Sequence, residues 1–163
     1  MTIYIFGYGS IINLKYIKQI DIKKKRNIYP VMLRNHLRHW IYTSSKNIYL
    51  GLYNQKSKNV NGILVEVTET ELDLLDQREK YYIRKEIDKD DIDESYQSVL
   101  IESDDIIYAY YSDPSKTVKW VFDFESKQMK DYLYNVLSGC IKINRKFFED
   151  FLLSTKGWKN NKI

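Results

Sequence analysis

A glycine-containing turn close to the N-terminus is the first candidate for chemistry. The segment Phe6-Gly7-Tyr8-Gly9-Ser10 follows an apolar, β-branched run over residues 2–6. Two glycines allow the backbone to turn sharply and to approach a ligand closely, and consecutive N–H groups in such a turn can point at an anion or a developing oxyanion. A tight turn from a strand into a helix explains the same segment equally well, so the segment alone does not establish a site.

The second candidate is a charged cluster near the middle of the chain, Leu75-Asp76-Gln77-Arg78-Glu79-Lys80-Tyr81-Tyr82. Charges at the end of a helix are usually exposed to solvent. Helical spacing singles out Glu79, because it follows Leu72 and Leu75 at positions i, i+3 and i+7 and so shares their apolar side. A carboxylate on the core side of a helix end is partly desolvated, which raises its pKa toward the range that suits acid–base catalysis. If the helix reaches residue 79, Glu79 is the expected proton-transferring group.

Other common catalytic and cofactor sites fit the sequence poorly. A dinucleotide-binding fingerprint needs a third glycine where Ile12 stands, and Ser10 lacks the Gly-x-Ser-x-Gly frame of a nucleophile elbow. His36 and His39 have no carboxylate or thiolate close in sequence that would complete a metal site. Cys140 has no visible activating partner. We therefore expect no metal and no cofactor, and chemistry carried by a carboxylate and by backbone amides.

The hydrophobic pattern predicts the elements that position the two segments. Residues 2–6 predict a buried strand that ends at the glycines, and the capping box Thr68-x-x-Glu71 predicts a helix that runs to about Glu79. Between them we expect a short helix over residues 13–19, a strand over residues 27–41 with a bend at Pro30, and a hairpin of residues 48–53 and 62–67 around a polar loop.

The second half of the chain predicts more strands and then helices. Strands are expected over residues 81–87, 96–101 and 106–111, an amphipathic helix over residues 125–137 with a stop at Gly139, and a last helix over residues 145–154. With 163 residues, the chain is long enough for one self-sufficient core. We therefore expect a single α+β domain over residues 1–155 with a curved or barrel-like sheet and flanking helices, followed by a polar tail over residues 156–163.

Composition and charge narrow the possible classes. Apolar residues make up 44% of the chain and charged residues 29%, as in soluble globular proteins. We expect no membrane span, because there is no apolar run of about 18 residues, and no signal peptide. A single cysteine suits a reducing compartment, so a cytoplasmic location is expected. The net charge of +4 is concentrated in one basic run, Lys23-Lys24-Lys25-Arg26, which indicates a solvated loop more than a nucleic-acid site.

Several short stretches of the sequence occur in an order and spacing that are known from other proteins. They are Phe-Gly-Tyr-Gly-Ser-Ile-Ile from residue 6, Leu-Asp-x-Arg-Glu-Lys-x-Tyr from residue 75, and between them Leu37-Arg38-His39-Trp40, Tyr49-Leu50-Gly51-Leu52 and the run over residues 61–67. Together they resemble the signatures of the gamma-glutamylcyclotransferase superfamily, especially its ChaC-like branch. Residues 132–139 and 147–155 resemble the closing helices of that family, so the resemblance covers essentially the whole chain.

The resemblance implies a small mixed β-barrel with surrounding helices and an enzyme without a cofactor. Family members cut a γ-glutamyl amide by cyclisation: the α-amino group of the substrate attacks its own γ-carbonyl, which releases 5-oxoproline and an amine. By resemblance, Glu79 is the catalytic acid/base. The substrate-binding loop is then formed by Gly7, Tyr8, Gly9, Ser10 and Ile11. Tyr108 and Tyr110 face the same side of a predicted strand and are expected to line the pocket, although packing in the sheet explains them equally well.

The resemblance leaves the substrate open. Glutathione is the first expected substrate, followed by γ-glutamyl amino acids and γ-glutamylamines. The ChaC-like branch usually has glycine and tyrosine after its Glu-Lys pair, whereas Lys80 is followed here by Tyr81 and Tyr82, and the bulkier residue could reshape the pocket. Two other classes stay open: a non-catalytic module on the same fold that binds a small anion or a protein, which the presence of Glu79 disfavours, and a basic nucleic-acid binder.

Overall fold

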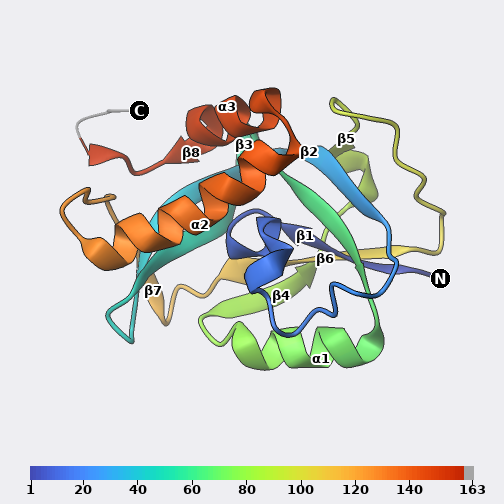
Figure 1. Ribbon diagram of the computed structural model, residues 1–163, viewed down its shortest axis with the longest axis horizontal. Helices are drawn as coiled ribbons and strands as arrows, with labels where there is room; N and C mark the ends of the chain where they lie inside the picture. The colour runs from blue at the N-terminus through green and yellow to red at the C-terminus, as the bar shows by residue number, and fades with distance from the viewer. Residues whose placement is uncertain (160–163) are drawn as a thin grey trace.

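The computed structural model describes residues 1–159 and shows an α+β architecture, in which one eight-stranded sheet is accompanied by three α-helices (Figure 1). Six strands lie in the order β4-β6-β1-β3-β2-β5, while β7 and β8 pair with other parts of β2. The end strands β4 and β5 do not pair with each other, so the sheet is open and "barrel" describes it only loosely. The predicted α+β class is confirmed.

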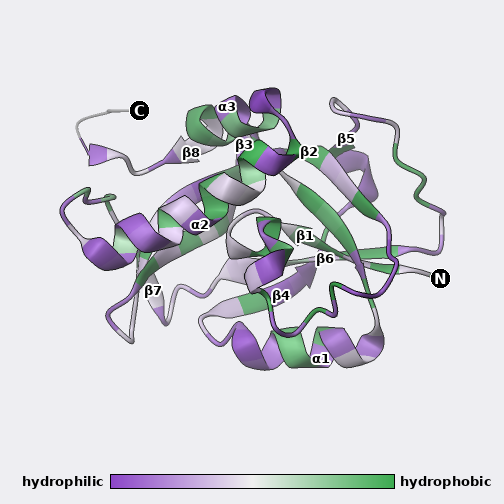
Figure 2. Cartoon of the chain, viewed as in Figure 1, coloured by the Kyte–Doolittle hydropathy of each residue, from purple (hydrophilic) through white to green (hydrophobic). Residues whose placement is uncertain are grey.

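The elements have the following bounds within the described residues. The strands are β1 (Ile3–Gly7), β2 (Ile28–Thr43), β3 (Ile48–Val67), β4 (Tyr82–Glu86), β5 (Ile92–Asp93), β6 (Ile106–Ser112), β7 (Thr117–Lys119) and β8 (Thr155–Lys156). The α-helices are α1 (Glu69–Arg78), α2 (Lys127–Ile143) and α3 (Arg145–Ser154). Figure 2 shows hydrophobic and hydrophilic residues mixed along α2 and α3, as expected of helices that bury one face.

Strand β1 lies inside the sheet and leads directly into the glycine turn. It runs antiparallel to β3 and parallel to β6, with Ile5 opposite both Val65 and Tyr108. Tyr4, Ile5 and Phe6 are almost wholly buried. A short continuous apolar run is typical of a strand that is covered on both faces. The predicted strand over residues 2–6 is confirmed, with a shift of one residue.

Strands β2 and β3 form one long antiparallel hairpin, which differs from the prediction. Residues 48–53 and 62–67 do not pair with each other, because both belong to the single strand β3 and pair with β2. The polar residues between them belong to β3 and not to a loop; residues 54–59 are exposed, whereas Asn61 is buried. The irregularity in β2 lies between Arg34 and His36, where Asn35 has a φ of 62°, and not at Pro30, which pairs in register with Ile63.

Helix α1 begins with the predicted capping box. The Thr68 hydroxyl accepts a hydrogen bond from the Glu71 amide, and the Glu71 carboxylate accepts one from the Thr68 amide. The same carboxylate forms a two-pronged ion pair with Arg26, with both distances at 2.8 Å. Burial alone would raise the pKa of Glu71, but the hydrogen bonds from Arg26, Thr68 and Asp21 outweigh it and lower this pKa to about 2. The start of α1 is therefore fixed by a buried charged pair.

Helix α2 corrects two predictions. Gly139 does not stop the helix, which continues to Ile143. The glycine instead allows close approach, because a Cβ at this position would lie 2.9 Å from the Cβ of Asn13 and 3.0 Å from the carbonyl oxygen of Ile12. The predicted helix over residues 13–19 is reduced to a single 3-10 turn, Leu14–Tyr16. The Asn13 side chain donates to Asn135 O at 2.8 Å and to Ser138 Oγ at 3.0 Å on α2, so it anchors this segment and caps no helix.

Two further segments differ from expectation near the end of the chain. Residues 96–101 form no strand, and Tyr96 there packs on Phe147 of α3. The predicted polar tail from Lys156 is ordered at its start: β8 pairs with β2 beside Arg38, and Trp158 packs against Trp40 with ring centroids 5.7 Å apart. Residues 160–163 of the predicted tail lie outside the described part of the chain.

The described residues also bear on membranes and metals. Among residues 1–159, no helix is both long and apolar enough to cross a membrane. Over the same residues, no three His, Cys, Asp or Glu side chains gather in a way that could hold a metal ion.

The Arg26–Glu71 pair should make stability depend on pH. We expect Glu71→Gln to lower the free energy of unfolding at pH 7 by about 2 kcal/mol, because a carboxylate whose pKa falls on folding stabilises the folded state above its unfolded pKa. That contribution disappears as the pH falls from about 5 toward 2, so the two proteins should converge in stability there. Urea unfolding at pH 7 and pH 3 measures the difference.

Glu69→Gln is the matched control for this change, because Glu69 is exposed in the same helical turn. It should change the free energy of unfolding by less than about 0.5 kcal/mol. A Glu71→Gln loss that is equally large at pH 3 and pH 7 would contradict the proposed pairing energy.

Candidate active site

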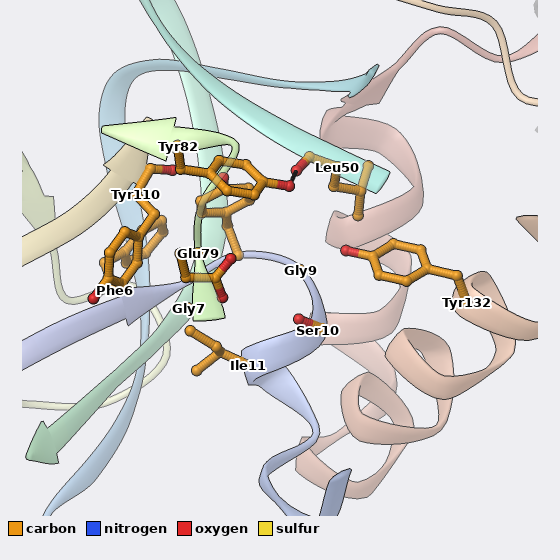
Figure 3. A pocket seen from close by; sticks show the side chains of 11 residues that line it. Phe6, Gly7, Gly9, Ser10, Ile11, Leu50, Glu79, Tyr82, Tyr110 and Tyr132 are labelled. Carbon is orange, nitrogen blue, oxygen red and sulfur yellow. Dashed lines mark hydrogen bonds between the residues drawn. The ribbon is translucent and has the colours of Figure 1, made fainter. Parts of the chain in front are cut away.

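A narrow pocket lies at the carboxyl end of β1, where the two candidate segments meet (Figure 3). The glycine turn forms one wall and Glu79, at the end of α1, stands beside it. The other lining residues come from four further elements: Leu50 on β3, Tyr82 on β4, Tyr110 on β6 and Tyr132 on α2. Segments that are far apart in sequence therefore converge on one small space.

Most of the residues predicted for the site line this pocket. They are Gly7, Tyr8, Gly9, Ser10, Ile11, Tyr110 and Glu79. Tyr108 does not line it. Tyr108 stands opposite Ile5 in the parallel register of β1 and β6, level with the middle of β1, and Tyr110 lies two residues further along β6. The Arg84 guanidinium lies over the Tyr108 ring, 4.5 Å from its centroid.

Close contacts explain the two glycines in the turn. A Cβ on Gly7 would lie 2.6 Å from Cγ2 of Ile11, and a Cβ on Gly9 would lie 2.9 Å from the hydroxyl oxygen of Tyr132. After Gly9 the chain enters a short 3-10 turn, Ser10–Ile12. N–H groups at the start of such a turn have no acceptor within it. The turn thus combines tight packing with N–H groups that have no acceptor within the turn itself.

Arg38, a fully buried residue in the middle of β2, holds this turn from the side of the core. Its Nη1 donates to the carbonyl oxygen of Tyr8 at 3.1 Å and to that of Asn61 at 2.7 Å. Its other N–H groups reach further neutral acceptors: Asn61 Oδ1, Phe151 O, Ser154 Oγ and Thr155 Oγ1. Burial lowers the pKa of Arg38 to about 9, so the guanidinium stays protonated at neutral pH.

Glu79 occupies the C-cap position of α1, one residue beyond the helix. Its side chain is 11% exposed, so it is buried as helical spacing indicates even though the helix ends earlier. Burial raises the pKa of Glu79 above the ordinary carboxyl value, and the neighbouring Arg78 opposes this rise. Arg78 donates to Glu79 Oε1 and also, at 3.1 Å, to Ser10 Oγ. One guanidinium therefore links the two segments that the sequence singled out.

Three tyrosines complete the pocket as neutral phenols. The Tyr82 hydroxyl donates to Leu50 O at 2.8 Å, and the Tyr110 hydroxyl donates to Asp76 Oδ1 at 2.7 Å. Burial raises the pKa of Tyr132 to about 12, and it raises the pKa of Tyr82 well above the ordinary phenol value. These hydroxyl groups can donate hydrogen bonds at neutral pH but do not act there as anions.

Sequence reasoning missed Leu50, Tyr132 and the bridging role of Arg78. Tyr132 belongs to an element far along the chain, yet a signal existed: it precedes Leu133 and stands between Met129 and Val136 on the inward side of an amphipathic helix. Leu50 had no distinguishing signal, since its contribution depends on where β3 passes the turn. Tyr82 was noted only as a departure from the ChaC-like pattern, and it proves to line the pocket.

The two histidines and the cysteine, which the sequence analysis excluded from metal and nucleophile sites, make structural contacts. Both ring nitrogens of His36 are engaged, by Arg34 O at 2.8 Å and by the Tyr111 hydroxyl at 2.7 Å. Nδ1 of His39 lies 2.8 Å from Trp40 O. Cys140 is buried, and burial raises the pKa of its thiol to about 12. None of these groups lines the pocket.

Comparison with known families agrees with this geometry. The sequence profile of the family described as gamma-glutamyl cyclotransferase, AIG2-like, matches residues 5–128. That range holds most of β1, the glycine turn, Arg38, Glu79 and Tyr110. The chain belongs to this family. The gamma-glutamylcyclotransferase superfamily inferred from the sequence signatures is thereby confirmed, and membership in the AIG2-like family supports a cyclotransferase-like function. Of the pocket residues, only Tyr132 falls outside the matched range.

Solved structures share the fold of this AIG2-like family member. A gamma-glutamyl cyclotransferase aligns with all of this chain and 94% of its own, at a TM-score of 0.67 and 11% identity. YkqA from Bacillus subtilis aligns over 91% of this chain and 52% of its own (TM-score 0.65, 13% identity). A yeast gamma-glutamyl cyclotransferase specific to glutathione covers 94% and 95% of the two chains (TM-score 0.59, 12% identity). At these identities the likeness concerns the fold. A search among curated proteins found no match.

The contacts of Arg38 predict a large loss of stability for a conservative change. Arg38→Lys should lower the free energy of unfolding by about 3 kcal/mol, because one ammonium group cannot reach acceptors on four segments and leaves several of them buried and unpaired. Arg34→Lys, on the same strand but half exposed, should cost less than about 0.5 kcal/mol. Denaturant unfolding compares the two, and equal losses would show that the acceptor network contributes little.

The close approach of Gly9 and Tyr132 predicts energetic coupling between them. Gly9→Ala should destabilise the protein by about 1–3 kcal/mol through overpacking, and Tyr132→Phe should recover about 1 kcal/mol of that loss by removing the hydroxyl group. Tyr134→Phe, on the exposed side of the same helix, should recover none. A double-mutant cycle by urea unfolding measures both couplings. Independence of Gly9 and Tyr132 would contradict the contact.

Proposed function

We propose that the protein is a gamma-glutamylcyclotransferase that cleaves a γ-glutamyl amide to 5-oxoproline and an amine, with Glu79 as its acid/base. The observation that carries this proposal is the desolvated Glu79 carboxyl group standing beside the glycine turn (Figure 3), with Arg78 hydrogen-bonded to Glu79 and to Ser10 of the turn. Family membership supports the reaction class, and the raised pKa of Glu79 supports its role in proton transfer.

In the proposed reaction, the α-amino nitrogen of the substrate attacks its own γ-carbonyl carbon. The new C–N bond closes the five-membered lactam, and the bond from the γ-carbon to the leaving nitrogen breaks. Glu79 takes one proton from the attacking nitrogen and delivers it to the leaving nitrogen, so no net proton is gained or lost. Proton transfer of this kind contributes roughly 10²–10⁴-fold in rate.

The glycine turn and the tyrosines would hold the substrate in a reactive shape. Intramolecular attack requires a curled γ-glutamyl chain, and holding two reacting groups in contact can supply several kcal/mol. In our proposal, the amides of residues 8–10 bind the glutamyl head or the developing oxyanion, a type of contact whose loss typically costs about 10²–10³ in rate. Tyr82, Tyr110 and Tyr132, which line the pocket, would limit the access of water to the bound substrate.

Glutathione is the first substrate to test, because the two sequence signatures resemble the ChaC-like branch. The yeast neighbour that shares the fold is specific to glutathione, which adds to the case for testing it. Other γ-glutamyl peptides, γ-glutamyl amino acids and γ-glutamylamines follow. The non-catalytic alternative, a small-anion or protein-binding module on this fold, predicts binding of a γ-glutamyl compound without release of 5-oxoproline.

Removal of the carboxylate tests the assignment. Glu79→Gln should keep the fold but lower 5-oxoproline formation at least ~100-fold, because an amide cannot relay the proton. Mass spectrometry of 5-oxoproline with a panel of γ-glutamyl compounds measures turnover. Asp73→Asn, an exposed carboxylate change on the same helix, should leave turnover within about twofold. Near-normal release by Glu79→Gln would remove Glu79 from the mechanism.

The pH profile gives an independent readout. Since Glu79 acts as a carboxylate, kcat/KM should rise with pH through its pKa, and burial places this acid limb above the ordinary carboxyl value of 4.5. The residual activity of Glu79→Gln should lack that limb. An identical limb in both proteins would assign it to another group.

A further inference from the structure

A second, roomier hollow adjoins the first pocket. It shares Ser10, Glu79, Tyr82 and Tyr132 with the narrow pocket, and it encloses a space of about 260 Å³. Its additional lining residues are Asn47, Tyr49, Arg78, Lys80 and Tyr81. We call this space the outer compartment. The shared Glu79 means that a molecule bonded at this carboxylate can extend into both spaces.

The proposed reaction assigns different parts of the substrate to the two spaces. The glycine turn, which would hold the γ-glutamyl group, lines the narrow pocket, and only Ser10 of that turn reaches the outer compartment. The leaving nitrogen must lie next to Glu79 to receive its proton. Whatever is attached to that nitrogen therefore extends past Glu79 into the outer compartment.

The outer compartment is cationic. Arg78 and Lys80 line it, and Nζ of Lys116, outside the lining, donates to the carbonyl oxygen of Lys80 at 3.0 Å. Glu79 is the only carboxylate among its lining residues, and Arg78 already pairs with it. The nearby Asp113 carboxylate accepts hydrogen bonds from Ser115 at 2.7 and 2.9 Å within its own turn. The positive charge of Lys80 is thus left without an acidic partner in the lining.

The walls of the compartment suit a short organic group beside that charge. The Tyr49 and Tyr132 rings meet edge to face with centroids 5.3 Å apart, and the half-buried Asn47 and Tyr81 add polar groups. Aromatic walls with a few polar groups are typical of small-molecule sites. A cationic side chain at the mouth attracts an anionic group and repels a cationic one.

We propose that the outer compartment is a leaving-group subsite for a carboxylate-bearing amine, read mainly by Lys80. The substrate class is then γ-glutamyl amino acids and γ-glutamyl peptides, in preference to γ-glutamylamines, whose leaving groups are neutral or positively charged. This inference rests on the proposed function. The carboxylate takes no part in bond making: the amide C–N bond breaks, the leaving nitrogen gains the proton from Glu79, and the carboxylate departs unchanged with the amine.

A matched pair of substrates tests the subsite. γ-Glutamyl-alanine and γ-glutamyl-ethylamine differ only by the carboxylate on the leaving group. We expect kcat/KM for 5-oxoproline release to favour γ-glutamyl-alanine at least ~10-fold, because the charge-assisted contact is absent from the amine. The preference should weaken as salt is raised from low to about 0.5 M, since Lys80 is exposed and screened by ions.

A charge reversal tests whether Lys80 causes the preference for γ-glutamyl-alanine. Lys80→Glu should reduce the ratio of the two kcat/KM values at least ~10-fold, by replacing attraction with repulsion. Lys58→Glu changes the net charge equally on an exposed part of β3 outside both hollows and should keep the wild-type ratio. The ratio serves as the readout because general damage to the active site lowers both values together.

The outcomes separate the two proposals. If neither compound yields 5-oxoproline, and no other γ-glutamyl compound does, the proposed function fails and takes the subsite with it. If both compounds react with equal kcat/KM, or if Lys80→Glu leaves the preference intact, the cyclotransferase proposal stands and the carboxylate subsite is overturned.

Discussion

The structure is organised around a buried guanidinium that has no carboxylate partner among its contacts. Arg38 satisfies its N–H groups with neutral oxygens from the glycine turn, from β3 and from the end of α3. A buried charge costs several kcal/mol unless such acceptors surround it. The C-terminal end of a helix carries partial negative charge, so α3 contributes its dipole as well as its oxygens. Burying Arg38 therefore requires these segments to converge on the middle of β2.

This requirement places the candidate site between two anchored parts. On one side, Arg38 holds the glycine turn through the carbonyl oxygen of Tyr8. On the other side, the capping box and the Arg26–Glu71 pair fix the start of α1, which delivers Glu79 at its far end. Arg78 then joins the two parts through Ser10 and Glu79. Arg26, Arg38 and Arg78 each bind different partners, and together these contacts fix the position of the Glu79 carboxyl group.

Local signals predicted the fold wherever the decisive contacts are local. The apolar run of β1, the capping box of α1 and the span of α3 were all readable, because burial and capping depend on neighbours a few residues away. The burial of Glu79 followed from helical spacing with Leu72 and Leu75. The sequence signatures in the glycine turn and in the charged cluster then indicated the superfamily.

The errors arose where distant contacts override local preference. Polar residues 54–59 looked like a loop, but they belong to β3, with Asn54 and Asn59 paired to β2 on either side of its irregularity. Gly139 was predicted to end a helix. It lies inside α2 instead, where the absence of a side chain allows Asn13 to pack closely against it. Tyr132 lies on an element that no pattern ties to the glycine turn, and Tyr108 was placed in the pocket because the alternation of a strand gives its facing side but not its level. The register of the strands and the docking of the helices depend on contacts across the whole sheet, which local sequence patterns do not contain.

The parallel pairing of β1 with β6 has a consequence for synthesis on the ribosome. Ile3 meets Ile106, about a hundred residues later in the chain, and Arg38 finds its last acceptors only at residues 151–155. Contacts of such long sequence separation form slowly. Strand β1 therefore lacks its partner on one edge until residues 106–108 have been translated, and unpaired strand edges of this kind are prone to aggregation. The candidate site, which combines the turn at residues 6–10 with Tyr132, is therefore among the last features of this fold to be completed.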